Sequence, residues 1–418
     1  MYNKTVLDNG IRIVTEEINH VRSVSLGVWV ESGSRYENPV NNGVAHFIEH
    51  MLFKGTEGRS AFDIASAIDS VGGVMNAFTG KELTSFYVKV PDYHCSMAIE
   101  LLADIFHHSR FDPEEIDKEK SVVIQEINML EDTPDEYIHD FFGQIFWDAH
   151  PLGLPILGTA ETVNAFHRQD IVGFFSERYS GDNLIITAAG NLNHDVFADM
   201  IENVFGSFVN KRVNKHIVTP AVASQVAVLN KNLEQVHVVI GTLAPSATSD
   251  VRYAAFLMNT VLGGSMSSRL FQEIREKRGL AYSIHSFLVP YKDSGMYCVY
   301  FGTSEKNVID VIKLVMDELN KVCDGLLSDS EIDSAKEQMK GNFLLSMEST
   351  DVRMTRLAKN EIYFARNIHF DEVVDNIDAV TIDAVRAIAC DMFRPEILSM
   401  AVLGRVKRED FPARLLRS

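Results

Sequence analysis

The order of expected elements is repeated in the two halves of the chain, and this repetition constrains the fold more than any other feature of the sequence. Each half opens with a β-branched stretch typical of a strand, at residues 24–30 and at residues 236–242. Each half also closes on an apolar strand candidate, at residues 184–190 and at residues 398–404. Two domains of one fold are therefore expected.

The closest match between the halves lies at the start of a long helix. Residues 112–117 read DPEEID and residues 328–333 read SDSEID, so both combine a helix-capping residue with acidic side chains in the first turn. The pattern predicts a duplicated α+β domain, in which a mostly antiparallel sheet packs against helices and the two domains form a clamshell. The other matched pairs are helix-like segments at 46–53 and 269–277, strands at 85–90 and 296–301, and amphipathic helices at 97–107 and 308–322.

The domain boundary is expected where this pattern is interrupted. The chain has 418 residues, which exceeds the usual size of one hydrophobic core. Residues 210–216 are polar, basic and aperiodic, and this character continues to Pro220. We therefore predict a first domain at 1–209, a linker at 210–222 and a second domain at 223–418.

Composition excludes several classes of protein. The 39 basic and 58 acidic side chains give a net charge of −19, which argues against a nucleic-acid binder. The sequence contains no run of about 20 apolar residues, so no membrane span is predicted. No leader is expected from the first residues. The four cysteines include no Cys-x-x-Cys pair, so neither a disulfide framework nor a thiolate metal site is indicated. A bacterial cytoplasmic protein is favoured over a mature mitochondrial matrix protein.

A metal-binding motif lies in the first half. In the segment HFIEH, His46 and His50 are four residues apart, so on a helix both imidazoles project from one face and can bind one metal ion. Glu49 lies beside them as a candidate general base. The order is that of the inverzincin motif. A zinc site needs a third protein ligand, and Glu119 and Glu126, two helical turns apart on the long helix, are the candidates.

Over nearly its whole length the sequence resembles the pitrilysin- or insulinase-type metallopeptidases, and most closely the branch of the mitochondrial processing peptidase and its bacterial relatives. The resemblance is carried by residues 46–56, HFIEHMLFKGT, and by the position of Glu126 downstream of them. It implies that His46, His50 and Glu126 bind one zinc ion per chain. It also implies that Glu119 orients a ligand and that Glu49 is the general base.

The second half lacks these ligands when the halves are aligned. Superposing residues 115–117 on residues 331–333 places Ala335 opposite Glu119 and Asn342 opposite Glu126. An approximate match of the earlier helices sets Arg269 and Glu273 opposite His46 and His50. The second domain is therefore predicted to bind no metal.

Further site residues follow from the resemblance. Residues 72–79 begin with two glycines and are typical of an exposed strand edge, where family members bind an extended peptide through main-chain hydrogen bonds. Without the resemblance this segment reads as an ordinary turn and strand. The resemblance implies that Asn76, Ala77 and Phe78 bind the substrate.

Two residues of the second half have family counterparts that reach the zinc site. The resemblance implies that Arg275 anchors the substrate backbone and that Tyr282 donates to the developing oxyanion. By itself this segment reads as a charged helix with a C-terminal glycine stop. Glu136 and Asp140 match acidic residues that contact an arginine near the cleavage point, although alone they indicate a solvated helix face.

These features predict a zinc metalloendopeptidase that hydrolyses peptides or unfolded, presequence-like segments in an enclosed chamber, with a preference for sites near basic residues. The family builds its chamber from four such domains, so a homodimer, or a hetero-oligomer with a related chain, is expected. A processing enzyme that cuts once near a basic residue is one variant of this prediction. The alternative from another class is a non-catalytic structural or partner subunit of a processing or respiratory complex.

Overall fold

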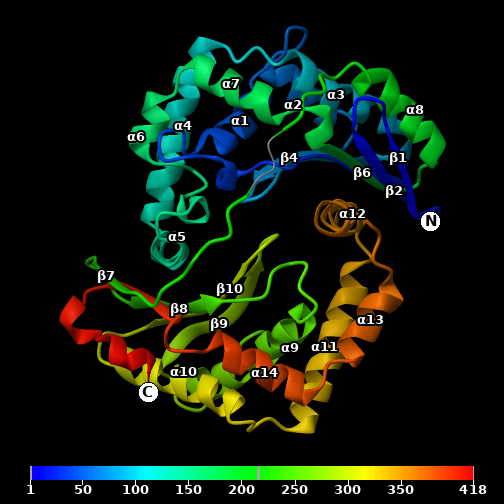
Figure 1. Cartoon of the computed structure of the whole chain (residues 1–418). Helices are drawn as coiled ribbons and strands as arrows, with labels where there is room; N and C mark the ends of the chain where they lie inside the picture. Colours follow the sequence, from blue (N-terminus) through cyan, green and yellow to red (C-terminus); the bar gives the residue numbers. More distant parts are fainter. Residues whose placement is uncertain (1, 214–216, 418) are drawn as a thin grey trace. The chain divides into compact units, whose positions relative to one another are not determined.

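The computed structural model describes residues 2–213 and 217–417, which form two compact units, each combining one β-sheet with helices (Figure 1). This arrangement confirms the predicted α+β class with two similar domains. Among the described residues, no helix is long and apolar enough to cross a membrane. The first unit contains residues up to Met129, the described residues from Leu154 to Ile217, and Ser346–Asn367. The second contains Leu130–Gly153, Val218–Leu345 and the described residues from Ile368 onward.

The first unit contains a six-stranded sheet in the order β1-β2-β6-β3-β5-β4. Only β2 and β6 pair in parallel, and every other neighbouring pair is antiparallel. The central strand β3 is buried along nearly its whole length, whereas β4 forms an edge of the sheet. The strands are β1 Tyr2–Val6, β2 Arg12–Glu17, β3 Ser23–Val30, β4 Val74–Thr79, β5 Thr84–Pro91 and β6 Leu184–Gly190.

Amphipathic helices cover one face of this sheet. Apolar side chains of α1 and α3, among them Phe47 and Phe106, pack with the inward residues of β3 and β5 into one large core. This burial positions α1, the helix that carries the HFIEH motif. The helices of the first half are α1 Val44–Leu52, α2 Ala61–Asp69, α3 Cys95–His108, α4 Pro113–Glu131, α5 Pro134–Phe146, α6 Ala160–Ala165, α7 Arg168–Arg178 and α8 His194–Phe205.

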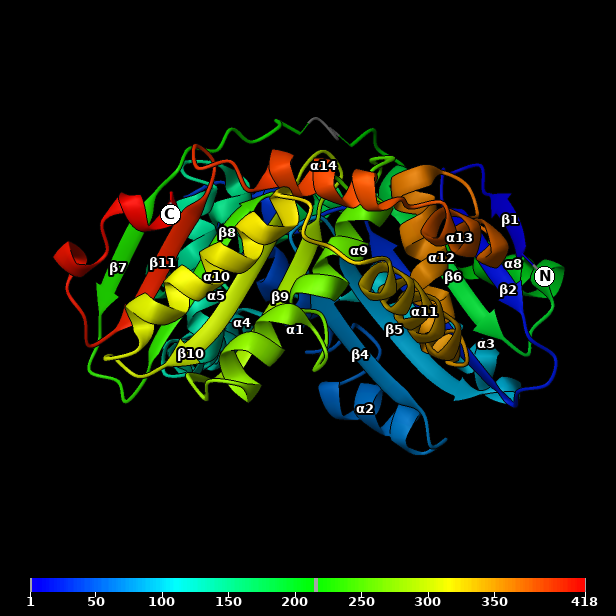
Figure 2. The same cartoon turned by 90° about the horizontal axis from the view of Figure 1, so that it is seen from below.

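The second unit contains a five-stranded sheet in the order β7-β11-β8-β10-β9, with β9 at one edge. Helices α9, α10 and α14 pack on one of its faces (Figure 2). The strands are β7 Val226–Asn230, β8 Val236–Leu243, β9 Ala281–Pro290, β10 Gly295–Thr303 and β11 Ser399–Gly404. The helices are α9 Arg252–Leu262, α10 Val308–Cys323, α11 Asp329–Ser346, α12 Thr350–Phe364, α13 Phe370–Asp378 and α14 Ile382–Met392, with a π-helix at Phe271–Glu276.

The other face of each sheet is covered by a helix from the opposite half of the sequence. Helix α12 lies on β2, β3 and β6 of the first unit (Figure 1). There, Met354 and Leu357 pack with Trp29. Helix α5 lies on β8 and β11 of the second unit, where Ile138 and Phe142 pack beside Val239. The two halves of the chain therefore exchange one helix each.

The two compact units are not contiguous in the sequence, unlike the predicted domains. Residues 130–153 fall within the predicted domain 1–209 but belong to the second unit, and residues 346–367 fall within 223–418 but belong to the first. The chain also passes from one unit to the other between Ile217 and Val218, inside the predicted linker 210–222. Sequence periodicity failed to predict the exchange because an apolar helix face indicates burial without identifying the sheet that it covers.

The order of elements also corrects one alignment between the halves. In the first half α1 and α2 precede β4, and in the second half α9 and the π-helix precede β9. Helix α9 is therefore the counterpart of α1, and the match of Arg269 and Glu273 with His46 and His50 is wrong. The sequence comparison did not include α9 and matched the charged segment that follows it to α1 instead. Helix α11 remains the counterpart of α4.

Candidate metal centre

A buried carboxylate fixes the start of α1, the helix that carries both histidines. Gly43 precedes the helix with a left-handed backbone, at a φ of 94°. Glu37 Oε2 accepts a hydrogen bond from the Gly43 backbone N–H, and Glu37 Oε1 accepts one from Ala45 N–H, both at 2.8 Å. Burial raises the pKa of Glu37 to about 7, although these donors and Asn42 act in the opposite direction. Glu37 thus satisfies N–H groups that a helix leaves unpaired at its start.

His46, His50 and Glu126 converge in the first unit. The Nε2 atoms of His46 and His50 are 3.2 Å apart, and Glu126 Oε2 lies 3.7 Å from the first and 3.6 Å from the second. Within the described parts of the chain, these residues are the one group of three or more His, Cys, Asp or Glu side chains whose ligand atoms lie within 4.8 Å of one another.

The donor set fits zinc. Ligands at about 2.0–2.2 Å from a tetrahedral zinc ion are about 3.3–3.5 Å apart, close to the separations of these three atoms. Burial, assisted by the charge of His50, lowers the pKa of His46 to about 3. His46 is therefore neutral at physiological pH and has a lone pair to offer a metal.

Glu119 contacts His50 and lies two helical turns before Glu126 on α4. Its Oε1 is 2.7 Å from His50 Nδ1, and its Oε2 is 2.5 Å from Lys54 Nζ. Burial would raise the pKa of Glu119, but the hydrogen bonds to His50 and Lys54 bring it below the usual value. An ionised Glu119 holds the proton of His50 on Nδ1 and leaves Nε2 directed at the cluster. His46 Nδ1 is also buried but has no hydrogen-bond partner within the described residues.

Glu49 lies on α1 beside this cluster. Its Oε2 accepts a hydrogen bond of 2.6 Å from the Thr79 hydroxyl at the end of β4. Burial raises the pKa of Glu49, while the Thr79 hydrogen bond and the charge of His50 lower it. A carboxylate so placed can take a proton from a water molecule and return it to a leaving group.

The predicted substrate-binding residues lie on the adjacent strand. Asn76, Ala77 and Phe78 belong to β4, whose one partner among the described strands is β5. The Ala77 backbone N–H donates to Asn76 Oδ1 at 2.8 Å. The Phe78 ring packs edge-on against Trp29, with ring centroids 5.8 Å apart. An unpaired edge can accept a peptide as an additional strand.

Four other predicted residues belong to the second unit. The Arg275 guanidinium lies over the rings of Phe271 and Tyr282, at 4.6 and 4.9 Å from their centroids. Tyr282 is 78% exposed at the start of β9. Glu136 and Asp140 lie on α5. The first unit therefore brings together His46, His50, Glu126, Glu119, Glu49 and the β4 residues, but not these four.

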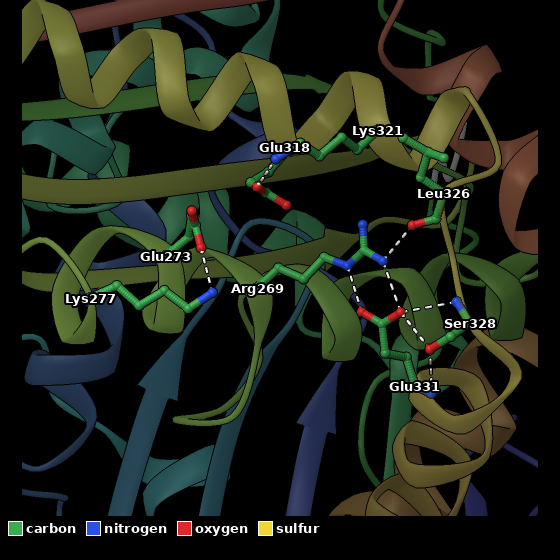
Figure 3. Close-up of polar contacts among 8 residues, drawn as sticks. All are labelled: Arg269, Glu273, Lys277, Glu318, Lys321, Leu326, Ser328 and Glu331. Carbon is green, nitrogen blue, oxygen red and sulfur yellow. Dashed lines mark hydrogen bonds and ion pairs between the residues drawn. The ribbon is translucent and has the colours of Figure 1, made fainter.

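In the second unit, the region around α11, the counterpart of α4, is held together by ion pairs. Arg269 donates to both carboxylate oxygens of Glu331, at 2.7 and 2.8 Å, and to the Leu326 carbonyl (Figure 3). Ser328 also donates to Glu331, and together these contacts lower the Glu331 pKa to about 2. Ala335, opposite Glu119, is buried and has no ligand atom in its side chain.

Sequence reasoning missed Thr79 and Glu37. Thr79 ends the glycine-led segment 72–79, and its polar side chain at the end of an expected edge strand was the available signal. Glu37 lies outside the first turn of α1, where capping residues are ordinarily sought, so no local signal identified it.

Comparison with known proteins shows the family of this chain. The model of the insulinase family, peptidase family M16, matches residues 12–160, and the model of the peptidase M16 inactive domain matches residues 165–339. This chain belongs to peptidase family M16. The inactive-domain match begins before the predicted linker and includes most of the second half. The described residues of that half contain no ligand cluster like that of His46, His50 and Glu126.

M16 relatives extend over nearly the whole chain. An uncharacterized zinc protease of Bacillus subtilis is 40% identical over 393 residues, which span 94% of this chain and 96% of the relative. One from Streptomyces coelicolor is 40% identical over 97% of this chain and 90% of its own length. A protease from Helicobacter pylori has the same fold, with a TM-score of 0.89 at 22% identity over 97% of this chain and 99% of its own.

Proposed function

We propose that this M16 protein is a zinc metalloendopeptidase whose metal is bound by His46, His50 and Glu126. The observation that carries this proposal is the convergence of the three ligand atoms beside Glu49. A bound zinc ion supplies Lewis-acid polarisation of the scissile carbonyl and lowers the pKa of water. We assign one zinc ion to each chain because the second unit offers no equivalent cluster among its described residues.

The protein's own residues carry the remaining chemistry. Glu49 takes the proton from the attacking water and returns it to the leaving amine when the peptide bond breaks. Glu119 orients His50 through the hydrogen bond to Nδ1. Asn76, Ala77 and Phe78 bind the substrate along the free edge of β4, through main-chain hydrogen bonds that accept many sequences. Extended peptides and unfolded segments are therefore the favoured substrates.

Residues of the second unit complete the proposal. Arg275 anchors the substrate backbone, and Tyr282 donates to the developing oxyanion. Glu136 and Asp140 attract basic side chains of presequence-like peptides, in keeping with the net charge of −19. We assign the enzyme to the bacterial cytoplasm, as a homodimer or in a hetero-oligomer with a related chain that encloses the site.

A non-catalytic partner subunit is the second candidate. It is favoured by one observation, the match of residues 165–339 to an inactive-domain model. That match concerns the half that lacks the ligands, whereas His46, Glu49, His50 and Glu126 are all present in the other half. We therefore prefer the catalytic function.

Zinc content and hydrolysis of a quenched fluorogenic peptide that contains arginine, measured for the wild type and for Glu49→Gln, test the proposal. We expect zinc in both proteins and a loss of activity of at least 100-fold, about the contribution of a general base, in the variant. A wild type that neither retains zinc nor gains activity when zinc is restored is a partner subunit and not an enzyme.

A further inference from the structure

A hydrogen bond connects the proposed general base to the neighbouring edge strand. Thr79 Oγ1 lies 2.6 Å from Glu49 Oε2, and the contact is partly buried. Thr79 is the last residue of β4, and Glu49 lies in the middle of α1. The bond therefore connects β4 and α1 at the carboxylate that is to accept a proton.

The direction of this hydrogen bond follows from the neighbouring groups. Thr79 and Thr84 face each other across the β4–β5 pair, with their hydroxyl oxygens 3.4 Å apart. Thr84 donates its one hydroxyl proton to the Ser32 carbonyl at 2.9 Å, so it has none for Thr79. The Thr79 hydroxyl oxygen is closer to Glu49 Oε2, at 2.6 Å, than to the Thr84 hydroxyl oxygen, at 3.4 Å. Hydrogen bonds to charged acceptors are also stronger than those to neutral ones. Thr79 is thus the donor and Glu49 the acceptor.

The surrounding structure holds the Thr79 hydroxyl in place. The hairpin is closed by a hydrogen bond of 2.8 Å from Gly80 N–H to the Leu83 carbonyl. Thr84 is 1% exposed, so the strand pair is anchored in the core at this point. A β-branched side chain also has few χ1 rotamers, which limits the motion of its hydroxyl.

We propose that Thr79 is a positioning residue that holds the Glu49 carboxylate in the orientation required of the general base. This inference rests on the proposed peptidase function. It adds a link between substrate binding and catalysis, because Thr79 directly follows Asn76, Ala77 and Phe78 on β4. The strand that receives the peptide thereby also fixes the base, so both are held in register by one element.

The test compares Thr79→Val, which keeps the shape but removes the hydroxyl, with Thr79→Ser, which keeps the hydroxyl. Thr15→Val is the matched control, since Thr15 is a fully buried strand residue of the same unit whose hydroxyl lies 2.8 Å from His194 Nδ1. For each protein we would measure zinc content, kcat and KM on the quenched arginine-containing peptide. Crystal structures of the zinc-loaded Thr79 variants would show the orientation of Glu49.

We expect Thr79→Val to lower kcat about 10- to 100-fold with KM changed less than about two-fold, since part of a general-base contribution is lost. Thr79→Ser should restore kcat to within about three-fold, and zinc content should be equal in all variants. The inference is overturned if Thr79→Val keeps the wild-type kcat, or if the serine variant is equally impaired.

The crystal structures test the positioning role of Thr79 independently of catalytic activity. In Thr79→Val the Glu49 carboxylate should leave its wild-type rotamer, and in Thr79→Ser it should keep it. An unchanged Glu49 in the valine variant refutes the positioning role even if the wild type hydrolyses no peptide. An inactive wild type would instead contradict the proposed function, so the two failures are distinguishable.

Discussion

The ring of Phe142, from α5, occupies the space that a side chain at position 241 would need. A Cβ atom on Gly241 in β8 would lie 2.5 Å from Phe142 Cζ. The same relationship recurs in the first unit, where a Cβ on Gly27 in β3 would lie 2.8 Å from Met354 Sδ of α12. Each sheet thus has a glycine in a central strand beneath the helix contributed by the opposite half, which allows that helix to pack closely.

Gly241→Ala should therefore destabilise the second unit. The added methyl group meets a rigid aromatic ring in a packed core, and overpacking of this kind costs about 1–3 kcal/mol of unfolding free energy. Denaturant unfolding followed by circular dichroism would measure the change. Gly143→Ala on α5 is the control, because a Cβ there meets nothing within 4 Å, and alanine in a helix should stabilise by about 0.5–1 kcal/mol. Equal stability of Gly241→Ala and the wild type would contradict the packing argument.

The exchanged helices should make the two halves of the chain interdependent. A fragment of residues 1–213 lacks α12 and exposes the apolar face around Trp29, while a fragment of residues 217–418 lacks α5 and exposes the face around Val239. Expressed alone, each should aggregate or bind a hydrophobic dye. Co-expressed, they should elute from size-exclusion chromatography as one soluble complex. Two separately soluble, monomeric fragments would show that the exchange is dispensable.

Zinc affinity should distinguish three of the acidic residues of α4, namely Glu126, Glu119 and Glu114. Glu126→Ala removes a ligand and should abolish stoichiometric zinc binding, whereas Glu119→Gln removes only the partner of His50 and should weaken binding about 10- to 100-fold. Glu114→Gln, at an exposed position of the same helix, should have no effect. Competition with a chromophoric chelator would measure all three affinities. If Glu126→Ala bound zinc as tightly as the wild type, the ligand set would be incorrect.

Acid should loosen α5 from the second sheet. Burial, with the charges of His285 and His237, lowers the pKa of His139 to about 4, and burial also lowers the pKa values of His237 and His285. Because an unfolded histidine has a pKa of about 6.5, the unfolded state binds more protons, so stability should fall as the pH decreases from about 6.5 to about 4. Asp135 acts in the opposite direction on His139.

His139→Gln tests this dependence. The variant should lose less stability across that pH range than the wild type, by about 1–2 kcal/mol once partial exposure is taken into account. Fluorescence of Trp147, which directly follows α5 and contacts Phe146, would report the transition. His20→Gln, whose side chain is exposed, is the control. Identical pH profiles for His139→Gln and the wild type would exclude a contribution from this histidine.

The sequence by itself was sufficient for the features that depend on local periodicity. His46 and His50 share a helix face because they are four residues apart, and Glu119 and Glu126 share one because they are seven apart. The duplicated order of strands and helices likewise follows from alternating and helical apolar patterns, which depend on burial within a single element. The convergence of Glu126 on the two histidines was an expectation from family resemblance, and the structure brings these atoms together.

Only the tertiary structure decided which surfaces meet. The apolar face of α5 requires burial, but its sequence does not distinguish the second sheet from the first, so the non-contiguous composition of the two compact units could not be predicted. Thr79 and Glu49 meet because β4 packs beside α1, and Glu37 reaches the start of α1 through a loop. Contacts of this kind depend on the positions of whole elements in three dimensions, whereas local sequence encodes only which side of each element is buried.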